Sequence, residues 1–259
     1  MCEPKFFEVC YVINPWMEGN LGNVNAELAQ RQWKKLYGIV AGLASVSLID
    51  PVAGLPDMVF TANAGLVWNK KFIASSFCHA ERRPEAKFFE KFFSSEGYGV
   101  AHLQQGTIFE GAGDALFDSQ GRLWLGSGFR SEPQALGEIV ALINVEAYGL
   151  ELVDPHWYHL DTAFCPLPGG QAIAYQKAFS GRSVAVLDDA FGEKIIWVSD
   201  QDARNFACNA ISLDGRILMN RISAELKSLL VKRGFEVIEA EVSEFIKAGG
   251  ACKCLTLEI

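Results

Sequence analysis

The residues best suited to covalent chemistry lie near the end of the chain, where residues 248–254 read AGGACKC. Two glycines directly before a strand allow backbone dihedral angles that other residues avoid, which suits a nucleophile at the mouth of a strand. Cys254 is the candidate thiol, and Cys252 shares its face if the segment is extended. Two other interpretations stay open: two small core residues, or half of a metal site whose remaining ligands come from the four histidines.

A histidine and an aspartate two residues apart form the second candidate group, within residues 158–164 (YHLDTAF). On a strand, His159 and Asp161 point to the same side. A carboxylate beside an imidazole raises the pKa of the imidazole and keeps it available as a general acid. A purely structural His–Asp pair is the alternative.

Two acidic residues flank glycines in residues 109–114 (FEGAGD). The Gly-x-Gly lacks the third glycine of a dinucleotide fingerprint and precedes a strand, so a phosphate-binding loop is excluded. Glu110 and Asp114 can instead approach a ligand closely, although an ordinary acidic turn fits as well. The chain also contains no Gly-x-Ser-x-Gly elbow and no His-Glu-x-x-His motif.

A repeat positions these residues. Four segments are each predicted to form two strands joined by a turn, and each begins with a polar residue. Those residues and the candidate thiol follow one another at separations of 51, 47, 48 and 45 residues, which predicts that they meet on one axis. The segments are 63–76, 114–127, 161–175 and 209–220, and the five residues are Asn63, Asp114, Asp161, Asn209 and Cys254.

Helical patterns lie between several hairpins, at residues 84–98, 131–145 (with Ser131 as a possible cap) and 223–232, and an earlier one covers 24–43. Each leads into a short apolar strand. A last strand, 254–259, is expected to pair with residues 7–14 and to close a ring, because a closed array has no unpaired edge. No linker divides the chain, so we expect one α/β domain over residues 1–259.

Composition excludes several classes of protein. Hydrophobic residues make up 50% of the chain and charged residues 21%, which excludes a disordered chain, and no apolar run is long enough to span a bilayer. A net charge of −8 argues against nucleic acid as a partner. Charged residues interrupt the first 20 positions, and the seven cysteines lack a C-x-x-C spacing, so we expect a cytoplasmic protein with reduced thiols.

A thiol, an imidazole, carboxylates and amides that meet on one axis would form an anionic cavity. A planar cation with several N–H donors, such as a guanidinium group, would complement it, because each carboxylate can accept paired N–H bonds. Separately each signal is weak, but together they predict one pocket.

With these features the sequence resembles the guanidino-group-modifying (pentein) superfamily of arginine deiminases, dimethylargininases and amidinotransferases. It is most similar to the arginine dihydrolase branch, which is the N-terminal catalytic module of cyanobacterial bifunctional arginine-catabolising enzymes. The resemblance implies an α/β propeller with five-fold pseudosymmetry, built from ββαβ units. The matching segments span almost the whole chain: residues 11–20, 58–65, 109–114, 128–131, 158–167, 205–209 and 249–257.

The resemblance also implies roles for individual residues. Cys254 would attack the guanidinium carbon, Glu110 and Asn63 would hold its nitrogens, and His159, oriented by Asp161, would protonate the departing ammonia and then activate water. Residues expected to bind the rest of the substrate are Asn14, Arg82, Asp114 and Arg130. No metal and no cofactor is implied, and the only partner expected is a small guanidino compound. A homo-oligomer stays open.

Asn63 bears on the substrate and product. Deiminases and dimethylargininases carry aspartate at the corresponding place, whereas an amide can also donate a hydrogen bond to a neutral ureido oxygen. Citrulline could then remain bound for a second round that yields ornithine, carbon dioxide and two ammonia. The alternatives are a deiminase or dimethylargininase that releases citrulline, an amidinotransferase, and a non-enzymatic binding protein with the same fold.

Overall fold

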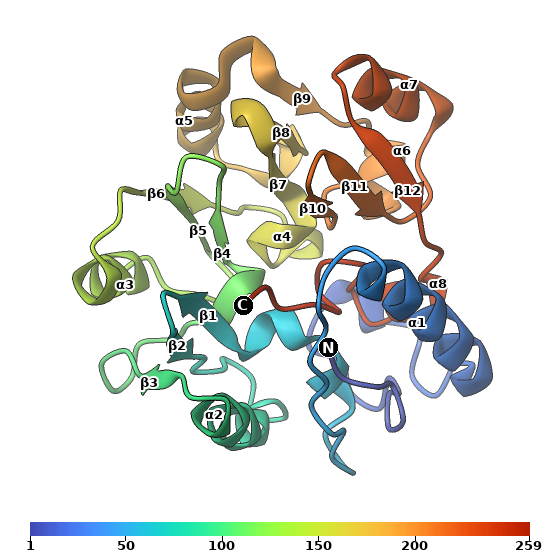
Figure 1. Ribbon diagram of the computed structural model, residues 1–259, viewed down its shortest axis with the longest axis vertical. Coiled ribbons are helices and arrows are strands. Elements are labelled where there is room, and N and C mark those ends of the chain that lie inside the picture. The colour runs from blue at the N-terminus through green and yellow to red at the C-terminus, as the bar shows by residue number, and fades with distance from the viewer.

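The chain folds as a ring of repeated units in the computed structural model, which describes residues 1–259 (Figure 1). Four three-stranded sheets have the same topology: the first two strands are antiparallel and the third pairs in parallel with the second. The four hairpins predicted from the repeat are therefore confirmed. The strands are β1 (Gly65–Trp68), β2 (Lys71–Ala74), β3 (Gly99–Ala101), β4 (Ala115–Phe117), β5 (Leu123–Ser127), β6 (Ala147–Glu151), β7 (Phe164–Leu167), β8 (Gln171–Ala174), β9 (Ile195–Trp197), β10 (Ile211–Leu213), β11 (Arg216–Met219) and β12 (Glu236–Glu239).

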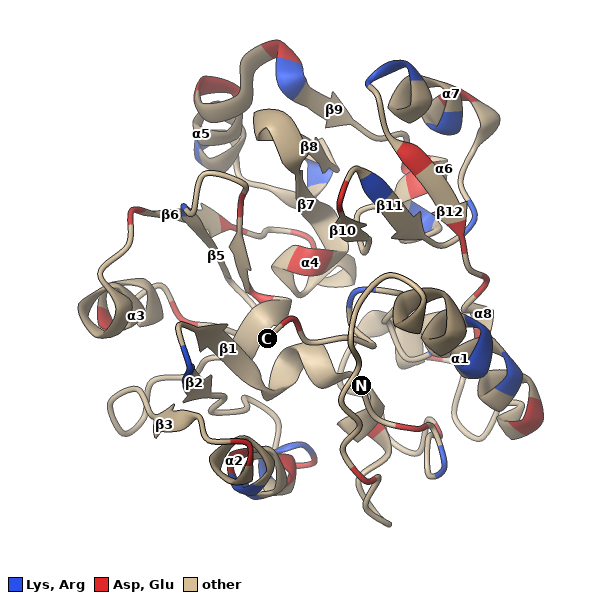
Figure 2. Cartoon of the chain, viewed as in Figure 1, with Lys and Arg blue, Asp and Glu red and all other residues tan.

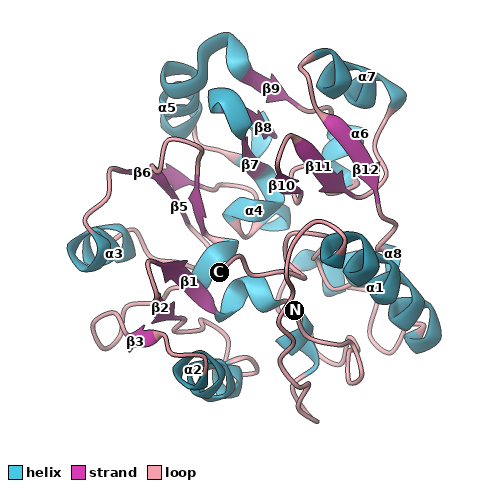
Figure 3. Cartoon of the chain, in the orientation of Figure 1, coloured by secondary structure: helices cyan, strands magenta, loops and turns pink.

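One helix joins the second and third strands of each unit, as a parallel pair requires a crossover connection. These helices are α2 (Ala86–Ser95), α3 (Ala135–Ile143), α5 (Gly181–Phe191) and α7 (Ala224–Lys232), and they lie on the outside of the ring (Figure 3). The pattern analysis did not identify α5 or β9. Ser131 does not cap α3, which begins at Ala135, because its hydroxyl donates instead to the Asp114 carboxylate at 2.6 Å.

The fifth unit combines both ends of the chain, but not with the predicted pairing. Residues 254–259 form a turn followed by irregular chain instead of a strand, because the Cys254 N–H donates to the Asn209 side chain and the Thr256 N–H to Lys253. Residues 7–14 form no strand either. Instead Cys2 and Ile49 form an isolated parallel β-bridge, and α1 (Ala26–Ala41) lies between these two residues in the sequence. Both chain ends lie near the middle of the view in Figure 1.

Apolar side chains fill the space between the sheets and the outer helices. Trp124 is fully buried, stacks on Tyr148 with ring centroids 4.7 Å apart, and donates its indole N–H to Asp118. Charged residues lie mostly on the outer helices and turns (Figure 2). None of the helices is both long and apolar enough to cross a membrane.

Short helical turns precede several of the inner strands and present the polar residues of the repeat. A 3-10 turn, Thr61–Ala64, carries Asn63, and another, Gly111–Gly113, comes directly before Asp114. The short helix α4 (Leu160–Ala163) carries Asp161. The two other short α-helices are α6 (Asp200–Arg204) and α8 (Ser243–Ile246). The polar residues therefore lie one turn ahead of the strands and not on them.

We expect the whole chain to unfold as one domain, including the fifth unit. Leu36 of α1 is fully buried, so Leu36→Ala should lower the free energy of unfolding by about 2–5 kcal/mol. Lys34→Ala, on the exposed face of the same helix, should change it by less than about 0.5 kcal/mol. Urea unfolding followed by fluorescence and circular dichroism should give coincident single transitions. Two separated transitions would contradict a single domain.

Candidate active site

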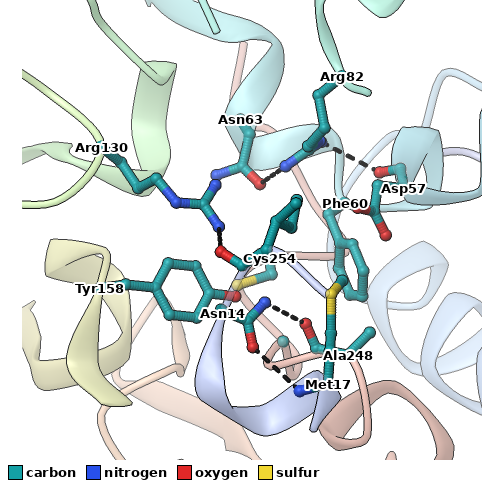
Figure 4. A pocket seen from close by; sticks show the side chains of 12 residues that line it. Asn14, Met17, Asp57, Phe60, Asn63, Arg82, Arg130, Tyr158, Ala248 and Cys254 are labelled. Atoms are coloured by element: carbon teal, nitrogen blue, oxygen red, sulfur yellow. Dashed lines mark hydrogen bonds between the residues drawn. The ribbon is translucent and has the colours of Figure 1, made fainter. Parts of the chain in front are cut away.

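A small buried pocket lies around Cys254, between the turns that precede the strands and the N-terminal segment (Figure 4). Its free volume of about 10 Å³ is close to that of one water-sized sphere. A ligand the size of an amino acid therefore requires side chains to move. The thiol pocket is lined by Ile13, Asn14, Met17, Asp57, Phe60, Asn63, Arg82, Arg130, Tyr158, Ala248, Gly250 and Cys254.

Hydrogen bonds fix the position of the Cys254 thiol. Its Sγ donates to Asp161 Oδ2 at 3.3 Å and accepts from Asn209 Nδ2 at 3.1 Å, while Asn209 Oδ1 accepts from the backbone N–H of Cys254 and of Ala251. Burial, and then the nearby Asp161 carboxylate, raise the pKa of the thiol well above its usual value. The resting group is thus a protonated thiol.

The two glycines before Cys254 are needed where they stand. Gly249 has a φ of +85°, in the left-handed region that favours glycine. A Cβ on Gly250 would lie 2.5 Å from the Phe60 ring, so a side chain there would push this loop away from the pocket. The predicted need for glycine next to the thiol is confirmed.

Cys252 does not share a face with Cys254, because the segment is a turn and not a strand. It is fully buried, and its Sγ faces the Ala240 carbonyl at 3.9 Å. Cys254 lines the thiol pocket and Cys252 does not. Geometry therefore distinguishes the two thiols and agrees with the choice of Cys254 as the candidate thiol.

His159 does not line the thiol pocket but contacts Asn63, which does, and its partner is not the predicted one. Its Nε2 lies 2.8 Å from Glu110 Oε2, and its Nδ1 lies 3.5 Å from Asn63 Nδ2. No hydrogen bond joins the ring to Asp161, because His159 precedes α4 in extended conformation and Asp161 lies within the helix. Burial lowers the pKa of His159 to about 4 despite the Glu110 carboxylate, so the ring is neutral near pH 7.

Asn63 has a fixed amide orientation. Arg82 Nη1 donates to Asn63 Oδ1 at 2.7 Å, which leaves the amide NH₂ facing the His159 ring. The bond from Arg82 therefore assigns the oxygen and nitrogen of this side chain. The orientation presents a hydrogen-bond donor to the site.

The carboxyl groups of Glu110 and Asp161 have pKa values shifted in opposite directions. Burial alone would raise the pKa of Glu110, but Arg130 and His159 hold it well below its usual value. Burial raises the pKa of Asp161 to about 7, and its Oδ1 is buried without a hydrogen-bond partner. Asp161 thus has an oxygen free to accept an N–H bond from a cation.

Both predicted arginines reach the thiol pocket (Figure 4). Arg82 is 3% exposed and forms a two-bond ion pair with Glu85, at 3.0 and 2.8 Å. Arg130 donates to Glu110 Oε2 at 2.9 Å and to the Ile13 carbonyl at 2.8 Å. In this state a guanidinium group of the protein itself is paired with Glu110.

Asn14 lines the pocket, but Asp114 does not. The Asn14 amide donates to the Ala248 carbonyl and accepts from the N–H groups of Trp16 and Met17, so it joins the N-terminal segment to the Cys254 loop. Asp114 accepts from Ser131 and from the Leu160 backbone N–H, behind the pocket. In this state the Asp114 carboxylate positions α4, and the role of Asp114 in substrate binding stays a prediction.

Two polar residues of the pocket, Asp57 and Tyr158, were not predicted from the sequence. Asp57 is 1% exposed, accepts from the Tyr11 hydroxyl at 2.9 Å, and has an Oδ1 without a partner. Burial raises its pKa despite Arg82. Tyr158 packs its ring 4.7 Å from the Arg130 guanidinium carbon and donates to the Gly249 carbonyl. Their sequence neighbours, Met58 and His159, lie in segments already singled out, which was the available signal.

Comparisons with known proteins agree with this arrangement. The family described as eukaryotic N,N dimethylarginine dimethylhydrolase matches residues 22–259. The chain is 48% identical over 261 residues to the bifunctional arginine dihydrolase/ornithine cyclodeaminase ArgZ of Synechocystis, covering 100% of this chain and 37% of that protein. It is 37% identical over 260 residues to the N(G),N(G)-dimethylarginine dimethylaminohydrolase of Mycobacterium tuberculosis, of which it covers 84%.

A solved structure extends the likeness to three dimensions. The substrate-bound N-terminal domain of ArgZ has a TM-score of 0.98 and 48% identity, over 99% of this chain and 96% of that one. The chain thus spans 37% of the length of the full-length curated ArgZ but nearly all of its N-terminal domain. With its family match over most of its length, the chain belongs to the dimethylarginine dimethylhydrolase family of the pentein guanidino-modifying superfamily.

Proposed function

We propose that this chain is a hydrolase that converts arginine to ornithine, carbon dioxide and two ammonia. The observation that carries the proposal is a set of contacts at the thiol pocket, which Cys254, Asn63 and Arg130 line. Behind them, Asp161 contacts Cys254, His159 contacts Asn63, and Glu110 contacts both Arg130 and His159. The protein with 48% identity is named an arginine dihydrolase, and its substrate-bound N-terminal domain has the same fold.

The pocket, together with Asp161 and Glu110 directly behind its lining residues, offers complementary groups to both ends of arginine. Asp161 Oδ1 and Glu110 Oε2 would accept N–H bonds from the guanidinium, which offsets its loss of hydration. Asp57, with its free oxygen, would hold the α-ammonium group. Arg82 and Arg130 would pair with the α-carboxylate, once Arg130 has released Glu110.

The first round removes one nitrogen. Cys254 Sγ attacks the guanidinium carbon, and His159 transfers the thiol proton to the departing nitrogen, which leaves as ammonia and yields an S-alkylthiouronium. Water, deprotonated by His159, then attacks the same carbon and releases citrulline and the thiol. Because the pKa of His159 is lowered to about 4, a resting thiolate–imidazolium pair is not expected. The cationic substrate itself would stabilise the thiolate.

Asn63 would support a second round. Citrulline carries a neutral ureido oxygen, which needs a donor, and the Asn63 NH₂ faces the site. A second attack by Cys254 expels the other ammonia and leaves an S-thiocarbamate. Water then releases N-carboxyornithine, which loses carbon dioxide to give ornithine.

Hydrolysis of dimethylarginine is the second candidate. The family match and the 37% identical mycobacterial protein favour it. The two activities differ in product, because dimethylarginine would give citrulline and dimethylamine. The thiol chemistry of the first round is the same in both.

Product analysis tests the proposal. Supplied with arginine, the protein should release ornithine and two equivalents of ammonia, and Cys254→Ala should abolish both. Asn63→Asp should shift the products towards citrulline, because a carboxylate cannot donate to the ureido oxygen. The exposed turn variant Asn69→Asp is the matched control and should keep the wild-type ratio. Citrulline accumulating from the wild-type protein without ornithine would contradict the proposal.

Arginine binding should depend on pH through Asp161. Its carboxyl group, with a pKa of about 7, is neutral below this pH and anionic above it. Calorimetry with the non-reacting Cys254→Ser variant should therefore show arginine affinity rising as pH increases from about 5.5 to about 8. Asp161→Asn in the same background should bind more weakly and lose this dependence. An unchanged pH dependence in the double variant would assign the titration to another group, such as Glu85.

Two glycine-to-alanine variants, one beside Asn63 and one far from it, test whether Asn63 must be held in place. A Cβ on Gly113 would lie 2.2 Å from Asn63 Nδ2, so Gly113→Ala should displace the amide and lower kcat/KM by about 100-fold. Gly137 lies inside α3 with nothing within 4 Å of its Cβ position. Gly137→Ala should keep wild-type kinetics and raise stability by up to about 1 kcal/mol. Equal kinetics for the two variants would show that Asn63 need not be held in place.

A further inference from the structure

Asn209 is one of the five residues that the repeat was predicted to bring together, and it contacts the candidate thiol. It lies just before β10, is fully buried and follows Asp161 by 48 residues. Its side chain does not line the thiol pocket. Contact with a substrate therefore falls to other side chains, and the group that Asn209 can influence is the sulfur of Cys254.

The hydrogen bonds of the Asn209 side chain use its whole capacity. Oδ1 accepts from the backbone N–H of Ala251 at 3.1 Å and of Cys254 at 3.2 Å. Nδ2 donates to the Asp161 carbonyl at 3.1 Å and to Cys254 Sγ at 3.1 Å. The two backbone donors at Oδ1 assign the orientation of the amide, so an N–H group faces the sulfur and has no competing partner.

The sulfur needs such a donor once it becomes a thiolate. The protonated thiol donates to Asp161 Oδ2 at 3.3 Å, but a thiolate has no proton to share, and an ionised Asp161 offers acceptors alone. Burial and the Asp161 carboxylate raise the pKa of the thiol, whereas the Ala251 N–H and the Asn209 amide lower it. Asn209 is thus a side chain in contact with Sγ that favours the ionised sulfur.

We propose that Asn209 is a catalytic residue whose amide N–H stabilises the Cys254 thiolate as the sulfur attacks and again as it leaves. The inference rests on the proposed function, in which the sulfur forms and then loses a bond to carbon in each round. A hydrogen bond to an ionised acceptor is roughly twice as strong as one to a neutral acceptor. The bond therefore stabilises the charged sulfur more than the resting thiol or the covalent intermediate. Asn209 keeps both of its amide protons throughout.

Alkylation measures the thiol without any substrate, because iodoacetamide reacts with the thiolate and not with the thiol. Asn209→Asp keeps the size of the side chain and its acceptor for the two backbone N–H groups, but replaces the donor at the sulfur with a carboxylate. At pH 8 and without arginine, peptide mass spectrometry should show Cys254 alkylated about tenfold more slowly in this variant than in the wild-type protein.

A second variant removes the donor without adding a charge. The side chain in Asn209→Ser is one bond shorter, so its hydroxyl can accept from a backbone N–H of the Cys254 loop but does not reach the sulfur. This variant should slow the alkylation of Cys254 at pH 8 by about threefold or more. It keeps the test valid if Asn209→Asp does not fold, and circular dichroism checks the fold of both variants.

Turnover of arginine separates an effect on the sulfur from an effect on substrate binding. Both variants should lower kcat by about 100-fold and change KM by less than about threefold, because a donor to the reacting atom is lost while the pocket lining stays the same. Asn220→Asp is the matched control at a buried amide of the same unit, which donates to the Asn205 carbonyl and accepts from the Val242 N–H. It should keep the wild-type alkylation rate and kcat, even if it lowers stability.

Two results would overturn the inference: wild-type alkylation of Cys254 in both folded Asn209 variants, or an equal slowing in Asn220→Asp. Either result would leave the proposed function intact if the wild-type protein still makes ornithine from arginine. A wild-type protein that does not act on arginine would overturn the proposed function instead, and the alkylation rates alone would then decide whether Asn209 stabilises the thiolate.

Discussion

The organisation of this protein depends on the burial of several charged groups around one thiol. Two arginines and the carboxyl groups of Glu85, Glu110 and Asp161 lie in a region closed to solvent. Each buried charge is costly unless it is paired and hydrogen-bonded, so each must meet its partners with good geometry. Each arginine pairs with a carboxylate of its own unit, whereas His159 reaches Glu110 and Cys254 reaches Asp161 from a different unit. The complete site therefore requires neighbouring units of the ring.

The site nevertheless keeps unsatisfied atoms where a substrate cation would lie. Asp57 and Asp161 each have one buried oxygen without a partner, and burial raises the pKa of both carboxyl groups. Glu110, in contrast, is already paired with Arg130. An entering arginine would thus relieve Asp57 through its α-ammonium group and Asp161 through its guanidinium. The same guanidinium would replace that of Arg130 at Glu110, which favours a cation of this shape over others.

The sequence predicted the repeat, the four hairpins and the convergence of their polar residues, because turn chemistry and strand patterns are local. It could not predict which polar groups pair. His159 contacts Glu110, 49 residues away, and Asp161 contacts Cys254, 93 residues away. Short helical turns ahead of the strands set these directions, and they depend on tertiary hydrogen bonds such as those from Asn209. The predicted strand pairing of the fifth unit was wrong because it also depends on tertiary contacts. Side-chain hydrogen bonds to the backbone replace a strand ladder there.

The proposed reaction requires a covalent bond between Cys254 Sγ and the guanidino carbon of the substrate. Acid quenching during turnover of arginine labelled with ¹³C in the guanidino carbon, followed by peptide mass spectrometry, examines that bond directly. The label should be attached to Cys254, whose Sγ lines the pocket, and to no other cysteine. Label on Cys252, or turnover with no labelled peptide under conditions that preserve thiouronium adducts, would contradict it.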